Sequence, residues 1–338
     1  MALVGAGLAL PAQPSAGDSV LDQARHAALV TPFEGTVSVQ WVDSQGVHSD
    51  LLKVTDTGGD IQIDGQGARA MAETDNERLA LQSGGWSLVA PGSPTAYGPE
   101  PALAPKYQVT TATGLPVAGR PTTLVDFRTA DGSSEERLFV DQGTGLLLRR
   151  EQQEDSKTVR VVSFESIQIG PTSGLRPPRI TKNEQPRQLS PDQLDAPYRA
   201  PQALAAGYQR VGVLEEQHVV QAVYSDGLHG LSVFEQVGQL NAGDLPRPAE
   251  TVQLGSARGL RYSWPGGDVI TWQSGPATYT VVSDGAESEV LAAAGSLPHA
   301  GSLSTGQRFL STCRRRTTAP RLAVDRLPSR PAGTTDVV

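Results

Sequence analysis

The chain has 338 residues, enough for two ordinary domains that each enclose a core. Its 36 glycines, 25 prolines and 5% aromatic residues are typical of a globular protein with many turns. The formal net charge of −8 gives no reason to expect nucleic-acid binding, and the single cysteine, Cys313, excludes an internal disulfide.

The N-terminus begins with an apolar run. Ala2 to Leu10 is followed by small and turn-forming residues, as in the later part of a secretory signal peptide. The run is too short to span a bilayer as a helix, and no Lys or Arg precedes Arg25. We interpret residues 1–17 as the remnant of a signal peptide and expect a secreted protein of the periplasm or cell envelope. An unstructured apolar start on a cytosolic protein is the alternative.

Strands dominate the first half of the chain. Ser19 to Leu29 predicts a first helix, which Pro32 ends. Apolar residues then alternate with polar ones, which is the period of a half-buried strand. Residues 107–170 read as one antiparallel strand after another, with a tight turn at residues 142–145. Such a succession predicts one curved sheet, which excludes a catalytic α/β core. The first domain is therefore assigned to residues 18–170.

The second half contains a linker, a further strand-rich region and a basic tail. Residues 171–203 are proline-rich and predict an extended linker. Residues 204–300 predict a smaller β-rich domain, with a hairpin turn at Asp226-Gly227 and a closing helix from Glu287 to Ala294. Residues 301–338 carry seven arginines against two aspartates and predict a disordered tail that can contact anionic lipid.

Residues that could carry chemistry are few. The five histidines are scattered, so no metal site is predicted, and no cofactor motif occurs. Ser225, Asp226 and His229 lie close in sequence, but we interpret them as a hairpin turn with an exposed histidine. Glu135 and Glu136 are interpreted as solvated strand edges. The protein is therefore predicted not to be an enzyme.

Several short segments together resemble the MucB/RseB family of extracytoplasmic regulators of an envelope-stress sigma factor. No single segment decides the resemblance, which depends on their order and spacing over roughly residues 20–295. The segments are Phe33–Thr36, Val117–Pro121, Leu138–Asp141, Thr144–Arg149, Phe164 with Ile167 and Ile169–Gly170, Val223–Leu228, and Ser232–Phe234.

The resemblance implies a mainly β fold with few helices: a curved antiparallel half-barrel like that of LolA and LolB, with a smaller antiparallel β-rich C-terminal domain. It implies that the protein binds the exported part of a membrane-spanning anti-sigma factor and responds to a lipid-type signal. The alternative is a lipid or lipoprotein carrier that uses the same apolar concavity. Membrane contact is expected only through the partner or the basic tail.

An open half-barrel leaves apolar side chains that a helix, a loop or a ligand must cover. Period-2 alternation places one set of residues on the concave face, where they are candidates for ligand binding; ordinary core packing is the alternative for each of them. The set is Val37, Val39, Trp41, Ile61, Ile63, Leu79 and Leu81.

Overall fold

The fold is taken from a computed structural model of the chain. It describes residues 16–58, 61–64, 102–172, 187–195, 198–216, 219–240, 249–264 and 266–299. All of these described residues belong to one compact unit. The predicted signal remnant before residue 16 and the predicted basic tail lie outside the described residues. Among the described helices, none is both long and apolar enough to cross a membrane.

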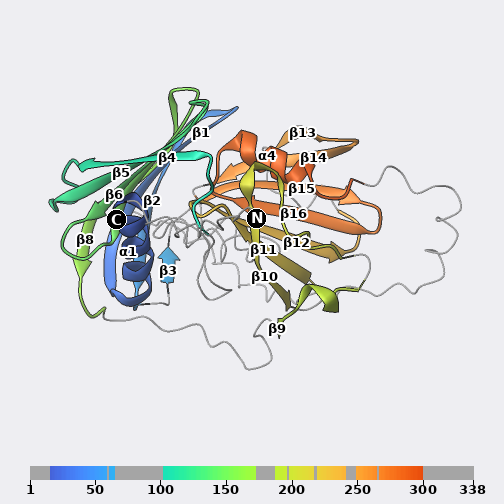
Figure 1. Cartoon of the computed structure of the whole chain (residues 1–338), viewed down its shortest axis with the longest axis horizontal. Coiled ribbons are helices and arrows are strands. Elements are labelled where there is room, and N and C mark those ends of the chain that lie inside the picture. Colours follow the sequence, from blue (N-terminus) through green and yellow to red (C-terminus); the bar gives the residue numbers. More distant parts are fainter. Residues whose placement is uncertain are drawn as a thin grey trace, which may run out of the picture. The chain divides into compact units, whose positions relative to one another are not determined.

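The first sheet has eight strands in the order β3-β2-β1-β8-β7-β6-β5-β4, and all its pairings are antiparallel (Figure 1). The long strands β1 and β8 pair with each other in the middle of the sheet, so the first and the last strand along the chain lie side by side. The strands are β1 (Phe33–Asp43), β2 (Gly46–Asp56), β3 (Ile61–Asp64), β4 (Tyr107–Thr113), β5 (Thr122–Thr129), β6 (Ser134–Asp141), β7 (Leu147–Glu154) and β8 (Lys157–Ile169).

The β6–β7 turn shows why the sequence folds back where predicted. The Asp141 carboxylate accepts hydrogen bonds from the Thr144 backbone N–H at 2.8 Å and from its hydroxyl at 2.7 Å. Gly145 follows with a φ of +82°, a conformation that side chains disfavour. Arg120 holds the same carboxylate at 2.8 and 2.9 Å. Asp141 therefore fixes both the turn and its contact with the β4–β5 connection.

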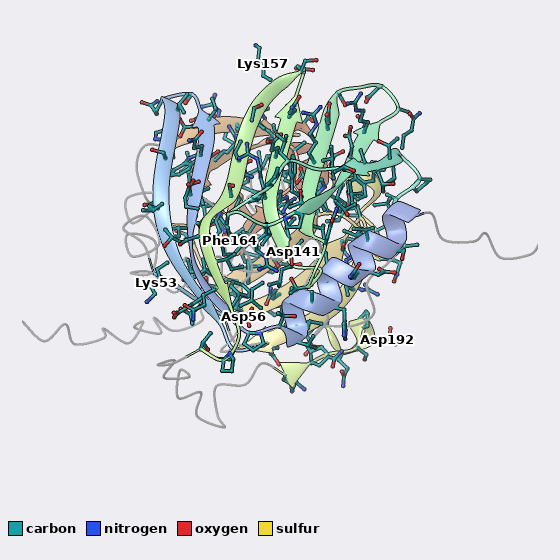
Figure 2. All side chains as sticks on the ribbon, turned by 90° about the vertical axis from the view of Figure 1, so that its left-hand side faces the viewer. Lys53, Asp56, Asp141, Lys157, Phe164 and Asp192 are labelled. Carbon is teal, nitrogen blue, oxygen red and sulfur yellow. The ribbon has the colours of Figure 1, made fainter. Side chains whose placement is uncertain are left out.

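Helix α1 (Ala16–Val30) lies across one face of the first sheet, as Figure 2 shows. Its Leu21 and Ala24 are buried against Val125, Phe127 and Leu138 of the sheet. The helix begins three residues before the predicted start and ends one residue after the predicted end. The apolar stripe of the helix therefore covers the face of the sheet to which Val125, Phe127 and Leu138 point.

The second sheet also has eight strands, in the order β13-β14-β15-β16-β12-β11-β10-β9, again antiparallel throughout. The strands are β9 (Arg187–Gln188), β10 (Gln209–Glu216), β11 (Val219–Ser225), β12 (Gly230–Val237), β13 (Glu250–Leu254), β14 (Ala257–Trp264), β15 (Gly267–Ser274) and β16 (Ala277–Ser283).

Helix α4 (Glu287–Gly295) covers the core of the second sheet. Its Val290, Ala293 and Ala294 are buried against a cluster that includes Trp272 and Tyr279, whose rings stack at 5.3 Å. The helix confirms the predicted closing helix to within one residue. Short 3₁₀ turns at Pro191–Gln193 and Ala205–Gly207 lead into this sheet.

The predicted fold class is confirmed: the described chain is mainly antiparallel β with two helices and two open sheets. The domain boundaries remain a prediction. One observation bears on the linker, because β9 pairs with β10 and Leu189 is buried against Val213 and Val220. The last part of the predicted linker therefore packs on the second sheet.

Candidate functional site: the polar junction between the sheets

Charged and polar side chains join the first sheet to the second. We call this set the sheet junction. From the first sheet and the residues leading into it come Lys106, Tyr107, Glu136, Arg150 and Gln152; from the second sheet, its turns and α4 come Asp226, His229, Asp284 and Glu289.

The turn between β11 and β12 is built locally by Asp226. Its Oδ1 atom accepts hydrogen bonds from the backbone N–H groups of Leu228 at 2.9 Å and His229 at 2.7 Å. Gly227 has a φ of +85°, and a Cβ there would lie 2.5 Å from the Cα of Leu103. Only glycine fits this close approach of two backbones. The Asp-Gly pair therefore makes the predicted hairpin turn and also allows the turn to pack on residues 102–104.

His229 is buried, which corrects the prediction of an exposed histidine: its side chain is 0% exposed. Its Nε2 atom lies 3.5 Å from Glu136 Oε2, and its Nδ1 atom lies 3.0 Å from the hydroxyl of Tyr107. Burial lowers the pKa of His229, but the hydrogen bonds and charges of Asp226 and Glu136 outweigh burial and raise the pKa to about 10. The imidazole is therefore a buried cation at neutral pH, with both ring nitrogens as donors.

Glu136 is buried as well, so the prediction of a solvated strand edge is wrong for this residue. Its Oε1 atom accepts a hydrogen bond from Nε of Arg150, whose Nη1 atom lies 2.5 Å from Asp284 Oδ2. Burial raises the pKa of Glu136, but Arg150 and His229 outweigh it and hold the pKa below its ordinary value. A buried arginine thus bridges a carboxylate of β6 and a carboxylate that follows β16.

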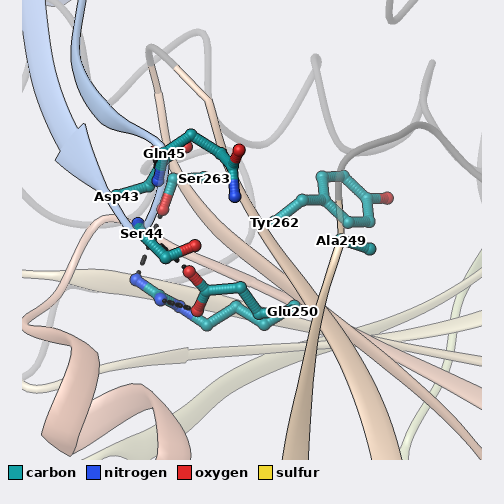
Figure 3. Close-up of a pocket in the computed structure, with 8 residues that line it drawn as sticks. Asp43, Ser44, Gln45, Ala249, Glu250, Tyr262 and Ser263 are labelled. Atoms are coloured by element: carbon teal, nitrogen blue, oxygen red, sulfur yellow. Dashed lines mark hydrogen bonds and ion pairs between the residues drawn. The ribbon is translucent and has the colours of Figure 1, made fainter.

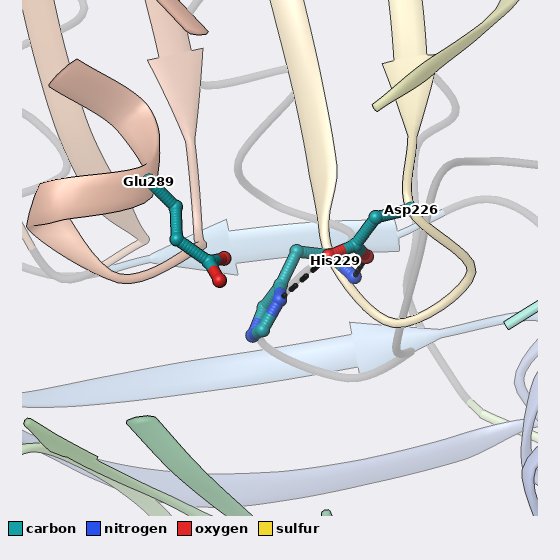
Figure 4. A group of neighbouring side chains, drawn as sticks. All are labelled: Asp226, His229 and Glu289. Carbon is teal, nitrogen blue, oxygen red and sulfur yellow. Dashed lines mark hydrogen bonds and ion pairs between the residues drawn. The ribbon is translucent and has the colours of Figure 1, made fainter. Parts of the chain in front are cut away.

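Asp226, His229 and Glu289 form a group whose ligand-type atoms lie within 4.8 Å of one another (Figure 4). The Nζ atom of Lys106 lies 2.9 Å from Asp226 Oδ2 and 2.7 Å from Glu289 Oε1. The ammonium thus supplies the cation that both carboxylates contact. The arrangement is a buried ion network, which does not fit a metal centre.

Comparison with known proteins gives matches among solved structures only. No protein-family model matches the chain, and no curated protein sequence matches it. The chain is similar to structures of MucB. The crystal structure of MucB is 20% identical, covers 83% of this chain and 96% of that chain, and has a TM-score of 0.43.

Two complexes are similar to the same degree. The complex structure of Pseudomonas aeruginosa MucA/MucB is 17% identical, covers 85% of this chain and 100% of that chain, and has a TM-score of 0.41. The crystal structure of MucB in complex with MucA(peri) is 19% identical, covers 84% of this chain and 100% of that chain, and has a TM-score of 0.40. These structures bear out the resemblance that the sequence predicts. At such identities and TM-scores the likeness carries no argument about a site or a partner.

A second group of charges lies at the β1–β2 turn. The Ser44 backbone N–H donates to Glu250 of β13 at 3.1 Å, and Arg261 of β14 donates to the same carboxylate at 2.9 Å (Figure 3). Arg261 also lies 3.0 Å from Asp268 and 3.0 Å from Glu287. A small cleft of about 20 Å³ opens beside these residues, lined by Asp43–Gln45, Ala249–Glu250 and Arg261–Ser263. It has room for about one water molecule.

One apolar contact accompanies the charges. Leu228, in the turn between β11 and β12, is fully buried in the cluster formed by α1 and the first sheet, with Phe127 and Leu138 among its members. Arg25 of α1 donates to the backbone carbonyl of Gly227 in the same turn. The turn therefore joins the sheets through an apolar side chain, a main-chain contact and the ion network at once.

The structure describes five of the seven residues predicted for the concave face. Val37 and Val39 are fully buried in a cluster with Phe33, Phe139 and Phe164, and Trp41 and Ile63 pack partly buried against it. Ile61 lies in β3, while Leu79 and Leu81 lie outside the described residues. A ligand-binding role for this set remains a prediction.

The sheet junction escaped the sequence analysis, but a signal for it exists. Glu136 lies two residues before the buried Leu138 on β6. Arg150 and Gln152 lie two and four residues after the buried Leu148 on β7. A charged residue in phase with an apolar stripe points inward. Such a residue needs a buried partner of opposite charge, and this requirement indicates a second layer over that face.

Proposed function

We propose that this protein is an extracytoplasmic regulatory binding protein that holds the exported segment of a membrane-spanning anti-sigma factor and responds to a lipid-type signal in envelope stress. The partner is drawn from the resemblance of the sequence to the MucB/RseB family. Two of the similar solved structures are of MucB with MucA, an interaction that belongs to those proteins.

The observation that supports a binding role is that the charged side chains of the sheet junction are buried and paired with one another. Within the sheet junction, the groups that could serve in acid–base chemistry include Glu136, Asp226 and His229. Their side chains are at most 1% exposed, and each is held by opposite charges or hydrogen bonds of the chain itself. A catalytic acid or base must reach a substrate. These residues instead hold two sheets together, which supports a scaffold for binding.

The test is a direct binding measurement. The exported segment of an anti-sigma factor from the same organism is titrated into the full chain by calorimetry, with a scrambled segment of the same composition as control. Saturable binding of the native segment at one site, without binding of the scrambled one, is the expected result. Absence of binding to the native segment overturns the proposal.

The same preparation tests the carrier alternative. Lipid extracted from the purified chain is quantified by mass spectrometry. Absence of binding to the segment, together with a lipid at fixed stoichiometry, would identify a lipid or lipoprotein carrier instead. The response to a lipid signal is tested separately, by adding vesicles that contain anionic lipid to the preformed complex and measuring release of the segment.

A further inference from the structure

Strand β4 forms one edge of the first sheet, and within the described residues no strand pairs with its outer side. It is the longest of the four described edge strands, at seven residues. The other edges are shorter: β3 has four residues, β9 has two and β13 has five. A long free edge presents a row of backbone donors and acceptors to another extended chain.

The direction of these backbone groups follows from the pairing of β4 with β5. The Gly114 N–H donates to the Thr122 carbonyl, and this pair continues the β4–β5 register. In an antiparallel ladder, hydrogen-bonded and non-hydrogen-bonded pairs alternate. The even-numbered residues of β4 therefore bond to β5. The N–H and C=O groups of Val109, Thr111 and Thr113 point away from the sheet, toward the open edge.

The side chains of β4 include none of the features that prevent another strand from pairing with this edge. Proteins protect exposed edges with charged residues, prolines, bulges or short strands. The segment from Tyr107 to Thr113 has no charged residue and no proline, and its pairing with β5 has no register shift. By contrast, β3 ends in Asp64 and β13 begins with Glu250. Thr111 and Thr113 are exposed and Val109 is half-buried, so β-branched side chains flank the free backbone groups.

We propose that the outer edge of β4 is a docking edge for an extended peptide, which adds to the first sheet as a further strand. Its occupant is the segment of the anti-sigma factor, so the inference rests on the proposed function. The free N–H and C=O groups require an extended backbone as their complement, and the uncharged, threonine-rich edge fits a stretch with few charges. Affinity comes from main-chain hydrogen bonds at Val109, Thr111 and Thr113.

The start of β4 connects this edge to the sheet junction. The Tyr107 hydroxyl donates to Asp226 at 2.7 Å, and the preceding Lys106 contacts Asp226 and Glu289. The Ala104 N–H donates to the Asp226 carbonyl at 2.7 Å. The first docking residue, Val109, therefore lies two residues along the strand from Tyr107, which contacts the buried charges that join the two sheets.

The first test is backbone hydrogen exchange of the full chain, with and without the segment. The amides of Val109, Thr111 and Thr113 are expected to gain protection on binding, at least about tenfold. The amides of Gln108, Thr110 and Ala112 already bond to β5 and are expected to change less. Binding of the segment without added protection at the three outward amides overturns the docking edge and leaves the proposed function standing.

A variant gives an independent test. Thr111→Pro removes one outward N–H and leaves the pairing with β5 intact, whereas Thr111→Ala keeps the N–H and serves as the matched control. The expected result is about tenfold weaker binding for Thr111→Pro and unchanged binding for Thr111→Ala, from the loss of one hydrogen bond. Should Thr111→Pro lower the melting temperature, Thr111→Lys replaces it, since an edge lysine opposes strand addition.

Two outcomes separate the competing explanations. Equal affinity of Thr111→Pro, Thr111→Lys and the parent chain for the segment overturns the inference. A concentration-dependent rise in mass of the chain alone by sedimentation, abolished by Thr111→Pro, would show that a second copy occupies the edge, which also overturns it. No binding of the segment to the parent chain rejects the proposed function itself.

Discussion

Nε2 of His229 lies 3.5 Å from Oε2 of Glu136, across the boundary between the second sheet and the first. Both side chains are fully buried, and both carry charge at neutral pH. Two buried ions are stable together only when each has partners that replace water. Arg150 is such a partner for Glu136 and Asp226 for His229, so these four charges stabilise the contact between the sheets together.

Removing one of these charges is expected to cost much of the stability. Glu136→Gln leaves Arg150 and His229 with one fewer countercharge inside the protein. A broken buried pair typically costs about 3 kcal/mol or more, so the free energy of unfolding should fall by about that amount. Urea denaturation followed by tryptophan fluorescence measures it.

The neighbouring Glu135→Gln is the matched control. Glu135 pairs with Arg128 and Arg137 on the opposite face of β6, where the side chains are partly exposed. Pairs of this kind contribute little, so Glu135→Gln should leave the unfolding midpoint nearly unchanged. An equal fall in the free energy of unfolding for the two variants would show that the buried ion pairs of Glu136 stabilise the protein no more than the exposed pairs of Glu135.

The charge of His229 predicts how stability depends on pH. Burial lowers its pKa, but Asp226 and Glu136 raise it to about 10 in the folded chain, against 6.5 in the unfolded chain. A group whose pKa is raised by folding stabilises fully below its unfolded pKa and loses that contribution as pH rises through its folded pKa. The contribution of His229 is therefore complete below about pH 6.5 and disappears by about pH 10.

The variant His229→Gln separates the contribution of His229 to stability from the contributions of other groups that lose a proton at alkaline pH. Denaturant unfolding at several pH values between these limits gives the stability of each chain. The difference in stability between the parent chain and His229→Gln should be largest at about pH 6.5 and shrink steadily toward pH 10. A difference that stays constant across the range would mean that His229 is neutral in the folded protein.

Local sequence pattern predicted the parts of the fold that local physics determines. The alternation of Val37 and Val39 with polar residues predicted β1, and Asp226-Gly227 predicted a hairpin turn because its side chain and backbone make that turn unaided. The burial of His229 could not be predicted in this way. Its partner Glu136 lies 93 residues earlier, on a different sheet, and the exposure of a turn residue depends on what packs over it.

Glu235 on β12 predicts a second pH effect, of different origin. Burial raises the pKa of this carboxyl group to about 7, and the hydrogen bond at 2.9 Å from the Arg199 backbone N–H offsets burial only in part. A carboxyl group with a raised pKa holds its proton in the folded chain, so stability falls as pH rises from about 4.5 to about 7.

Glu235→Gln should remove that loss, because the amide cannot ionise. The variant is expected to be more stable than the parent chain at pH 8 and to gain nothing at about pH 4.5. Thermal melts at the two pH values measure the difference. Glu215→Gln, on an exposed pair with Arg187, is the control and should show no such crossover. A variant less stable than the parent at both pH values would show that the Glu235 carboxylate is satisfied when ionised.

Leu228 tests the apolar part of the same turn. It is fully buried among side chains of α1 and the first sheet, although it belongs to the connection between β11 and β12. Leu228→Ala removes its buried methyl groups and leaves a cavity, so the free energy of unfolding should fall by about 2–5 kcal/mol. Leu115→Ala is the control, since Leu115 is 74% exposed and its loss should change stability by less than about 0.5 kcal/mol. If Leu228→Ala is as stable as its control, the turn is held by its charges alone, and Glu136→Gln should then be the more damaging variant.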